Sequence, residues 1–501
     1  GCAANAAQVP QESQEPHTAA LTATAAASVK SPKYVFLFIG DGMSYPQIQS
    51  TSDYLGALKD ADYWQAQPSL DDNQGAILDG PEYLNFMNFE AAGSAVTYDS
   101  NSFAPDSAST ATSISTGHKT YSGSINVDET GTIEYETIAE QLKAQKGWEI
   151  GVITSVNLNH ATPAAFYAHQ ASRSSYYEIG LELVESGFDY FAGGGLLKPT
   201  GSSGDQTDLY ELAQEAGYTV AKTHAEADAI GTNTEKAIII DEDLADSDAM
   251  AYELDRTDDM WALADYVAKG IEVLDNDTGF FMMCEGGKID WACHANDAAS
   301  SIHDTQALAD AVQVAIDFAK EHADETLILV TGDHETGGLT IGFAGTDYDT
   351  YLDLLENQKI SFAKYDSDYV ASYKANKPPF GTVLADIEKL FGLKAQGEEG
   401  DKLVLTAYEM EQLRAAYEKS INGTASSQYD QAEYVLYGTY EPLSVTITHI
   451  INNKSGISFT SYSHTGLPVA VLAEGAGSEM FNGYYDNTDI YNKLADLLNI
   501  A

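Results

Sequence analysis

The sequence predicts an α/β fold with a central, mostly parallel β-sheet flanked by helices on both faces. Short runs rich in β-branched and aromatic residues alternate with segments of helical period, which is typical of parallel strands joined by right-handed crossovers. Polar residues follow most of these runs, and such sheets bind ligands at the carboxyl ends of their strands. The 501 residues, 44% of them hydrophobic, suffice for one large domain with insertions or for two to three smaller domains.

Five runs are predicted strands, and four of them lead into polar residues. These four are Tyr34–Ile39 before Gly40-Asp41-Gly42, Glu149–Thr154 before Asn159-His160, Phe280–Met283 before Cys284-Glu285-Gly286, and Thr326–Val330 before Gly332-Asp333-His334. The fifth run, Val469–Ala473, instead follows Ser463-His464-Thr465-Gly466. The clearest helix is Ile302–Ala319, where Leu308, Val312, Ala315 and Ala319 fall on one face.

Two stretches depart from this alternation. Residues 196–260 are acidic and poor in strand signals, so we expect them at the periphery; the acidic run within 241–258 is interpreted as solvated surface. Residues 335–463 are rich in tyrosine and include a predicted strand at Leu443–Ile450. We expect an insertion within about 340–460 that forms a lid or crown over the site or a subunit interface. The alternative is a packed excursion with no special role.

The charge balance excludes some partners. Asp and Glu number 76 against 25 Lys and Arg, a net charge of −51. Nucleic acid is therefore not an expected partner, because its phosphates would be repelled. Dissolved salt relieves self-repulsion of this size, which favours a saline, halophilic habitat. No apolar run approaches the roughly 20 residues of a transmembrane helix.

Residues 1–31 are rich in Ala, Gln, Ser and Thr and are predicted to be a flexible leader or tether before a single domain at 32–501. Gly1-Cys2 resembles the end of a bacterial lipoprotein signal. We expect export to the periplasm or cell envelope; a lipid anchor at Cys2, export without lipidation and a cloning remnant remain alternatives. With only Cys284 and Cys293 besides Cys2, a disulfide scaffold is excluded, and these two form either a bridge or two free buried thiols.

Aspartates and histidines scattered along the chain make a set of metal ligands. Asp290 and His294, four residues apart, share one helical face and can bind one ion. Asp333-His334 can both face a crevice after a strand. Taken alone, Asp41 is a turn residue and His464 is as well explained as a structural histidine. Together, these oxygen and nitrogen ligands suffice for two zinc-like sites and one harder, oxygen-only site.

Ser107 begins a run of small residues, Ser107-Ala108-Ser109-Thr110-Ala111-Thr112. A helix that starts there would point its N-terminal dipole at an anion. A zinc-bound serine hydroxyl shifts towards alkoxide, which activates it as a nucleophile. Without the metal ligands, the run would indicate an ordinary Ser/Thr-rich helix start.

Six motifs, in this order along the chain, resemble those of the alkaline phosphatase family. They are IGDGM at 39–43, PDSASTATSISTGHKT at 105–120, HATP at 160–163, CEGGKIDWACHAND at 284–297, TGDHETGG at 331–338 and SYSHTG at 461–466. The resemblance extends over most of 33–500. It implies a phosphate monoester hydrolase that releases inorganic phosphate and an alcohol, and it also implies a homodimer.

The resemblance further implies two zinc ions and one magnesium ion per subunit. One zinc would be bound by Asp290, His294 and His464, and the other by Asp41, Asp333 and His334, with Ser107 joining during the reaction. Magnesium would be bound by Asp41, Thr162 and Glu285. Arg173 matches the family's phosphate-binding arginine, and Asp106 would orient it. Ser107 would attack phosphorus to give a phosphoserine, which water then hydrolyses.

Two positions near the third metal depart from some family members. His160 stands where some carry Asp, and Trp291 where some carry Lys or His. His160 is expected to brace the magnesium water shell or to favour another metal, and the Trp291 indole N–H to reach phosphate through water. The departure resembles marine and cold-adapted bacterial members. His118 and His169, near the motifs, are interpreted as structural or supporting residues.

Two alternatives compete with this interpretation. A superfamily relative such as a phosphodiesterase, sulfatase or phosphomutase would use a similar sheet and similar ligands, but would not explain Ser107 and Arg173 in their contexts. A tethered surface protein with an inactive phosphatase fold would have lost Ser107 or several ligands, and all are present.

The charge generates a first prediction. Because a protein of net charge −51 repels phosphate monoesters, we expect moderate NaCl to raise kcat/KM by screening its outer surface. The measurement is kcat/KM at fixed pH as NaCl rises from low concentration. A steady fall over that range would contradict the electrostatic explanation.

Overall fold

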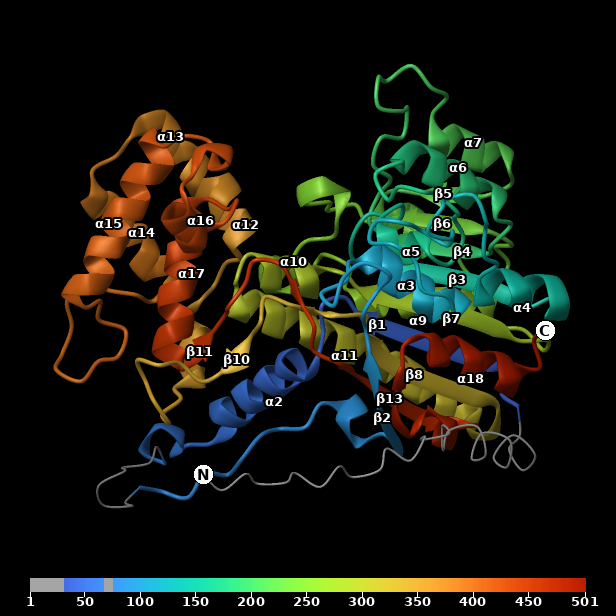
Figure 1. Cartoon of the computed structure of the whole chain (residues 1–501), viewed down its shortest axis with the longest axis horizontal. Coiled ribbons are helices and arrows are strands. Elements are labelled where there is room, and N and C mark those ends of the chain that lie inside the picture. The colour runs from blue at the N-terminus through green and yellow to red at the C-terminus, as the bar shows by residue number, and fades with distance from the viewer. Residues whose placement is uncertain (1–30, 67–74) are drawn as a thin grey trace, which may run out of the picture.

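A ten-stranded sheet forms the centre of the computed structural model, which describes residues 31–66 and 75–501 (Figure 1). Its order is β14-β2-β13-β8-β1-β7-β3-β4-β6-β5. The strands are β1 (Tyr34–Gly40), β2 (Ala91–Val96), β3 (Glu149–Thr154), β4 (Tyr190–Gly193), β5 (Thr219–Ala221), β6 (Ala237–Ile240), β7 (Phe280–Gly286), β8 (Thr326–Gly332), β13 (Val469–Gly475) and β14 (Gly483–Asp486). Within this sheet, every described pairing is parallel except those of β13 with β2 and β8. The predicted α/β class is therefore confirmed.

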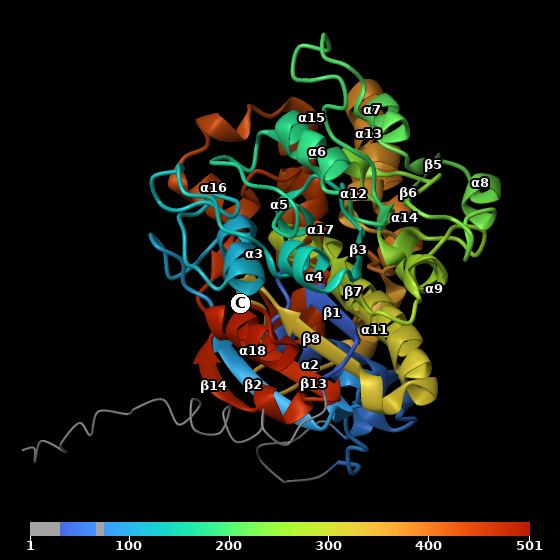
Figure 2. The same cartoon turned by 90° about the vertical axis from the view of Figure 1, so that its right-hand side faces the viewer.

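Helices cover both faces of the sheet, as the two views show (Figures 1 and 2). Strand β1 is buried throughout because its side chains alternate between two cores. Val35, Leu37 and Ile39 join one core, and Phe36 and Phe38 join the other. The first core contains residues of α3 (Ser107–Thr116), α4 (Ile138–Lys146), α5 (Ala161–Ala164), α6 (Tyr176–Glu185), α7 (Leu209–Glu215) and α18 (Thr488–Leu498). The second contains residues of α2 (Tyr45–Lys59), α9 (Leu263–Leu274), α10 (Lys288–His294) and α11 (Ala298–Glu321).

Three parallel strands end level with one another at the centre of the sheet. Gly40 at the end of β1 is paired with Gly286 of β7 on one side and with Gly332 of β8 on the other. The residues that leave these strands therefore meet at one edge, as expected for ligand-binding positions in such sheets.

The segment between β10 (Thr340–Ile341) and β11 (Ile457–Ser458) forms a helical lobe beside the sheet, drawn in orange in Figure 1. Its helices are α12 (Phe362–Tyr365), α13 (Ala371–Asn376), α14 (Phe380–Phe391), α15 (Ala407–Asn422), α16 (Gln431–Tyr437) and α17 (Pro442–Ser455). At its base, β10 pairs with β11, and β9 (Glu335–Thr336) pairs with β12 (His464–Thr465), both antiparallel. These two short ladders bring the two ends of the lobe together beside the sheet, although more than 100 residues lie between them.

The predicted strand at Leu443–Ile450 is wrong, because these residues lie in helix α17. Pro442 occupies its first turn, where a missing N–H does no harm. Every residue from Leu443 to Thr448 is buried, the polar ones included. The β-branched composition therefore reflects burial on several sides, which a short apolar run cannot distinguish from a strand.

Two further expectations are settled by the sheet and its core. Residues 196–260 lie at the sheet edge, but they also supply β5 and β6, which the sequence analysis missed because both strands are very short.

Cys284 and Cys293 are free, buried thiols, so the bridge is ruled out. Cys2 and the predicted leader up to residue 30 lie outside the described residues. In the part of the chain that the structure describes, no helix is long and apolar enough to cross a membrane.

His169 and His118 make local contacts. His169 bridges two helices: its Nε2 lies 2.8 Å from Glu140 Oε1 and its Nδ1 lies 3.1 Å from Glu182 Oε1. Burial lowers the pKa of His169, but hydrogen bonds and attraction from both carboxylates outweigh it and raise the pKa to about 10. The His118 ring stacks on Tyr135, with centroids 4.0 Å apart.

The His169 bridge predicts a loss of stability at alkaline pH. Since the folded-state pKa of about 10 exceeds the unfolded value of about 6.5, the bridge stabilises fully below pH 6.5 and loses its contribution as the pH rises to 10. Melting temperature measured from pH 6.5 to 10.5 should therefore fall less steeply in His169→Gln than in the unaltered protein. Parallel curves for the two proteins would show that His169 is not charged in the fold.

Candidate functional site

Three carboxylates lie together at the carboxyl edge of the central strands. Asp41 follows β1, Glu285 is next to last in β7, and Asp333 follows β8, and all three are buried. Gly42, with a φ of +73°, turns the chain so that its N–H donates to Asp333 Oδ1 at 3.0 Å. A Cβ at Gly42 would lie 2.7 Å from Thr336 Oγ1, so this turn requires glycine.

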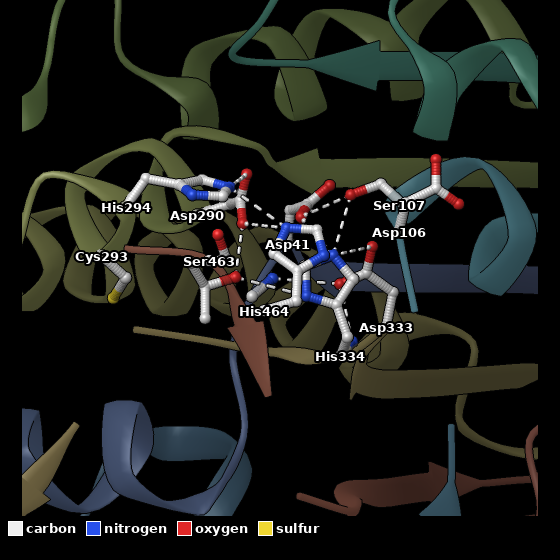
Figure 3. Close-up of polar contacts among 12 residues, drawn as sticks. Asp41, Asp106, Ser107, Asp290, Cys293, His294, Asp333, His334, Ser463 and His464 are labelled. Atoms are coloured by element: carbon white, nitrogen blue, oxygen red, sulfur yellow. Dashed lines mark hydrogen bonds and ion pairs between the residues drawn. The ribbon is translucent and has the colours of Figure 1, made fainter. Parts of the chain in front are cut away.

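Asp41, Asp333 and His334 form a first group, with ligand-type atoms all within 4.8 Å of one another. His334 Nε2 lies 3.2 Å from Asp41 Oδ1 and 3.4 Å from Asp333 Oδ2. Ser107 completes this group: its Oγ donates to Asp41 Oδ1 at 3.0 Å and lies 2.8 Å from His334 Nε2. Figure 3 shows these side chains facing one another from separate elements.

Ser107 is the first residue of α3, which the sequence analysis predicted as a helix start. Asp106 is the N-cap, and its carboxylate accepts from the Ser109 N–H at 3.0 Å. The small side chains of α3 are all buried, so the helix packs closely with its N-terminus at the carboxylate cluster. The positive end of the helix therefore adds to the attraction for an anion at Ser107.

Asp290, His294 and His464 form a second group, also within 4.8 Å. Asp290 and His294 project from one face of α10, as the spacing predicted, and His464 comes from β12. Each histidine Nε2 lies 3.3 Å from an Asp290 oxygen. The His464 ring stacks on that of His334, with centroids 3.6 Å apart, so the two groups are adjacent.

Thr336 connects these groups, although the sequence analysis did not single it out. Its hydroxyl donates to Asp290 Oδ1 and lies 3.3 Å from His334 Nδ1. Neighbouring Glu335 is also buried; it accepts from the Gln47 side chain at 3.0 Å and from the Thr465 hydroxyl of β12. Both residues lie inside the TGDHETGG motif, which was the available signal.

All three histidines are oriented in the same way. Their Nδ1 atoms lie next to backbone carbonyls: His334 beside Glu335 at 3.2 Å, His294 beside Tyr462 at 2.6 Å and His464 beside Pro105 at 2.6 Å. A carbonyl only accepts, so each Nδ1 carries a proton and each Nε2 faces the carboxylates. Metal-binding imidazoles are commonly held in this way.

Thr162 and Glu285 lie next to Asp41. Thr162 Oγ1 donates to Asp41 Oδ2 at 2.9 Å, and Thr154 Oγ1 donates weakly to Glu285 Oε2 at 3.4 Å. Among the described residues, buried Glu285 Oε1 and Asp333 Oδ2 accept no hydrogen bond. Buried oxygens of this kind need a partner, and a cation would provide one.

Arg173 approaches from the side of α3. Its Nη1 donates to Asp106 Oδ2 at 2.9 Å, and its Nη2 lies 3.3 Å from His160 Nε2. Because arginine only donates, His160 Nε2 accepts; burial, and then the charge of Arg173, lowers the pKa of His160 to about 4, so the ring is neutral. Trp291 packs its ring edge-on to His160, with centroids 6.1 Å apart.

The electrostatics of the site favour a bound cation. Burial, followed by repulsion from Asp41 and other carboxylates, raises the pKa values of Glu285 and Asp333 well above their usual range. Burial lowers the pKa of His334, but Asp333 and Asp41 outweigh it and raise the pKa to about 10. A divalent cation would relieve this repulsion, and the mixed nitrogen and oxygen donors suit zinc, with oxygen donors alone suiting magnesium.

The structure thus brings together all of the residues that the sequence singled out for this site. A further group of His224, Glu242 and Asp243 lies at the surface, in agreement with a solvated acidic run. Asp241 is the exception in that run, because it is buried and accepts from the Tyr266 hydroxyl at 2.6 Å.

Comparison with known proteins identifies the family. The family model "Alkaline phosphatase" matches residues 32–500. The chain belongs to the alkaline phosphatase family. It is 30% identical over 473 residues to alkaline phosphatase 4 of Bacillus subtilis, covering 93% of this chain and 88% of that protein.

Solved alkaline phosphatases share the fold. A cold-active enzyme from a psychrophilic Shewanella superposes with a TM-score of 0.70 at 28% identity, over 93% of this chain and 99% of the other. The enzyme of the Antarctic bacterium TAB5 gives 0.61 at 25% identity, over 94% and 99%. A TAB5 mutant with glutamate in place of a histidine has Mg bound in its M3 site. This alkaline phosphatase is accordingly a metal-dependent phosphate monoester hydrolase.

The buried carboxylates predict opposite effects of one substitution. In the metal-free protein, Asp333→Asn should raise the free energy of unfolding by about 1 kcal/mol, because a neutral amide replaces a carboxyl group whose ionisation is disfavoured by burial and by Asp41. It should also diminish the rise in melting temperature that we expect added zinc to produce, since a charged donor of the Asp41–Asp333–His334 group is lost. Thermal unfolding with chelator and with zinc measures both effects.

Asp297→Asn is the matched control. Asp297 is equally buried but accepts from Ser300, Gln358 and Phe362, so its replacement should destabilise the protein under both conditions. If Asp333→Asn destabilises the metal-free protein as this control does, the repulsion argument is wrong.

Proposed function

We propose that this alkaline phosphatase works through a phosphoserine intermediate at Ser107. Side chains around Ser107 would bind two zinc ions and one magnesium ion. The observation that carries the proposal is the position of Ser107 Oγ, 2.8 Å from His334 Nε2 and 3.0 Å from Asp41 Oδ1 at the N-terminus of α3. A buried serine among carboxylates and imidazoles has the surroundings of an activated nucleophile.

Two zinc groups are proposed from the donor sets. Asp290, His294 and His464 would hold one ion, and Asp41, Asp333 and His334 the other, next to Ser107. Asp41, Thr162 and Glu285 would hold magnesium; this is supported by Glu285 Oε1, which accepts no hydrogen bond within the described part of the chain. When bound, these ions supply positive charge to the oxygens of the reacting phosphate and lower the pKa of hydroxyl groups.

The chain's own residues then bind and orient the phosphate. Arg173 is held by Asp106, which leaves guanidinium N–H groups to donate to the non-bridging oxygens. The Asp106 carboxylate also caps α3, so Arg173 and Ser107 are kept in register by one side chain. Phosphoryl transfer depends chiefly on such positioning and charge stabilisation.

The reaction then has two displacements. Ser107 Oγ loses its proton and forms a bond to phosphorus as the bond between phosphorus and the ester oxygen breaks. That oxygen takes up a proton and leaves as the alcohol. Water next displaces Ser107 from phosphorus, which releases inorganic phosphate and returns the hydroxyl. In the resting state, the Ser107 hydroxyl donates a hydrogen bond to the Asp41 carboxylate.

His160 and Trp291 are proposed to adjust the third site and the phosphate. Neutral His160 supports Arg173 through Nε2, while its buried Nδ1 has no hydrogen-bond partner among the described residues. We propose that this N–H binds a water of the magnesium shell. The Mg-containing TAB5 mutant, in which a histidine is replaced by an acid, supports a link between a histidine and the metal at such a site. Trp291 is proposed to limit the space beside His160 and to reach phosphate through water.

The wider setting is also proposed. We propose an exported enzyme of the periplasm or cell envelope that forms homodimers, with the lobe at 342–456 as a lid or subunit interface. A lipid anchor at Cys2 would tether it, and the net charge of −51 suits a saline medium.

A comparison of three samples tests the serine mechanism. Release of p-nitrophenol from its phosphate ester at alkaline pH should fall about 10³-fold or more in Ser107→Ala, because the covalent nucleophile is lost. Chelator should abolish the activity of the unaltered protein, and zinc with magnesium should restore it.

Ser113→Ala is the matched control on the same helix. The Ser113 hydroxyl is buried and, among the described residues, its one hydrogen bond goes to the His118 carbonyl at 3.3 Å, so its loss should leave activity within about threefold. Metal-dependent activity that survives Ser107→Ala undiminished would refute the phosphoserine and indicate direct attack by water.

A further inference from the structure

The last helix of the lobe contacts the chain beside the Asp290–His294–His464 group. Asn296, two residues after His294, has a φ of +54° and is 2% exposed. Its Nδ2 donates to the Cys293 carbonyl at 3.0 Å and to the Ser461 carbonyl at 2.9 Å. The Asn296 amide therefore joins the end of α10 to the segment that leads to His464.

Two residues of α17 hold Asn296 from the other side. His449 Nε2 lies 2.9 Å from Asn296 Oδ1, and Asn452 Nδ2 donates to the Asn296 carbonyl at 2.7 Å. Both amide protons of Asn296 are used by carbonyls, so its Oδ1 faces His449 and accepts from it. Burial lowers the pKa of His449 to about 4, so the ring is neutral and carries its proton on Nε2.

The backbone carbonyl of Tyr462, the residue after Ser461, orients His294 of the site. The Tyr462 carbonyl accepts from His294 Nδ1 at 2.6 Å, and the Tyr462 ring packs against that of His449 with centroids 6.0 Å apart. His464 follows two residues later, and its Nε2 lies 3.1 Å from that of His294. A displacement of residues 461–462 would therefore turn His294 and move His464 together.

We propose that His449 of α17, acting through Asn296, is a positioning residue for the His294–His464 pair. The helical lobe thereby sets the geometry of the metal group formed by Asp290, His294 and His464. This inference rests on the proposed function only in taking these three residues as metal ligands. Replacing a residue that orients a metal ligand without itself touching the metal typically changes metal affinity about 10- to 100-fold.

The test measures metal binding directly. Chelator-stripped protein is titrated with Co²⁺, whose visible absorption reports the coordination geometry, and zinc-loaded protein is mixed with excess chelator to follow zinc release. We expect His449→Leu and Asn296→Gly to alter the cobalt spectrum and to accelerate one phase of zinc release about 10-fold. Glycine keeps the left-handed backbone of Asn296, so Asn296→Gly removes only the amide.

Two further variants separate positioning from general stability. His449→Gln offers an N–H near the place of Nε2 and should restore the spectrum and the release rate towards those of the unaltered protein. Asn126→Gly is the matched control: Asn126 is buried with a φ of +52°, and its Nδ2 donates to the Ala165 and Ala168 carbonyls at 2.8 and 2.7 Å. It should lower the melting temperature without changing zinc release.

The outcomes distinguish this inference from the proposed function. If His449→Leu and Asn296→Gly lower the melting temperature but keep the spectrum and release rate of the unaltered protein, α17 only packs and the inference is wrong. It is equally wrong if His449→Gln behaves as His449→Leu does in folded protein. An unaltered protein that takes up neither cobalt nor zinc would refute the proposed metal groups and the inference with them.

Discussion

Repulsion among buried carboxylates at the centre of the sheet is the constraint on which the site depends. Asp41, Glu285 and Asp333 are brought together because β1, β7 and β8 end level with one another. Burial denies these groups water, so their negative charge must be neutralised by protons or by cations. The backbone of Gly42, the hydroxyls of Ser107 and Thr162, and the positive end of α3 all turn towards the same place.

The histidines complete this arrangement from more distant parts of the chain. His464 stacks on His334, although 129 residues separate them, because the β9–β12 and β10–β11 ladders close the base of the helical lobe. Each imidazole is turned by a carbonyl at Nδ1, so the backbone decides which nitrogen faces the carboxylates. The lobe thus contacts the proposed metal-binding residues in two ways: through the two ladders at its base, and through the hydrogen bonds of α17 with Asn296.

The phosphate side of the site shows how a strongly acidic protein can receive an anion. Burial lowers the pKa of the Arg173 guanidinium, but Asp106 outweighs it and raises the pKa, so the guanidinium stays charged. The charge of −51 belongs to the whole molecule, whereas the field at Ser107 is set by the nearby carboxylates, Arg173, the α3 terminus and any bound cations. With cations bound, the local charge would be opposite in sign to the net charge, and the local charge governs binding at short range.

The sequence by itself determined the five adjacent central strands β13, β8, β1, β7 and β3, the polar residues beside them and the set of side chains that gather there. Buried parallel strands are continuous apolar runs, and the motifs at 39–43, 284–297 and 331–338 follow or end them, so both signals are local. The remaining features could not be predicted, because they depend on contacts between residues that are far apart in the sequence. The strand predicted at Leu443–Ile450 is helix α17, since β-branched residues buried on all sides have no period to read. The contacts of Thr336 with both ligand groups, and of His449 with Asn296, join residues that no local pattern relates. Only the tertiary structure decided these contacts, because they arise where separate elements pack against one another.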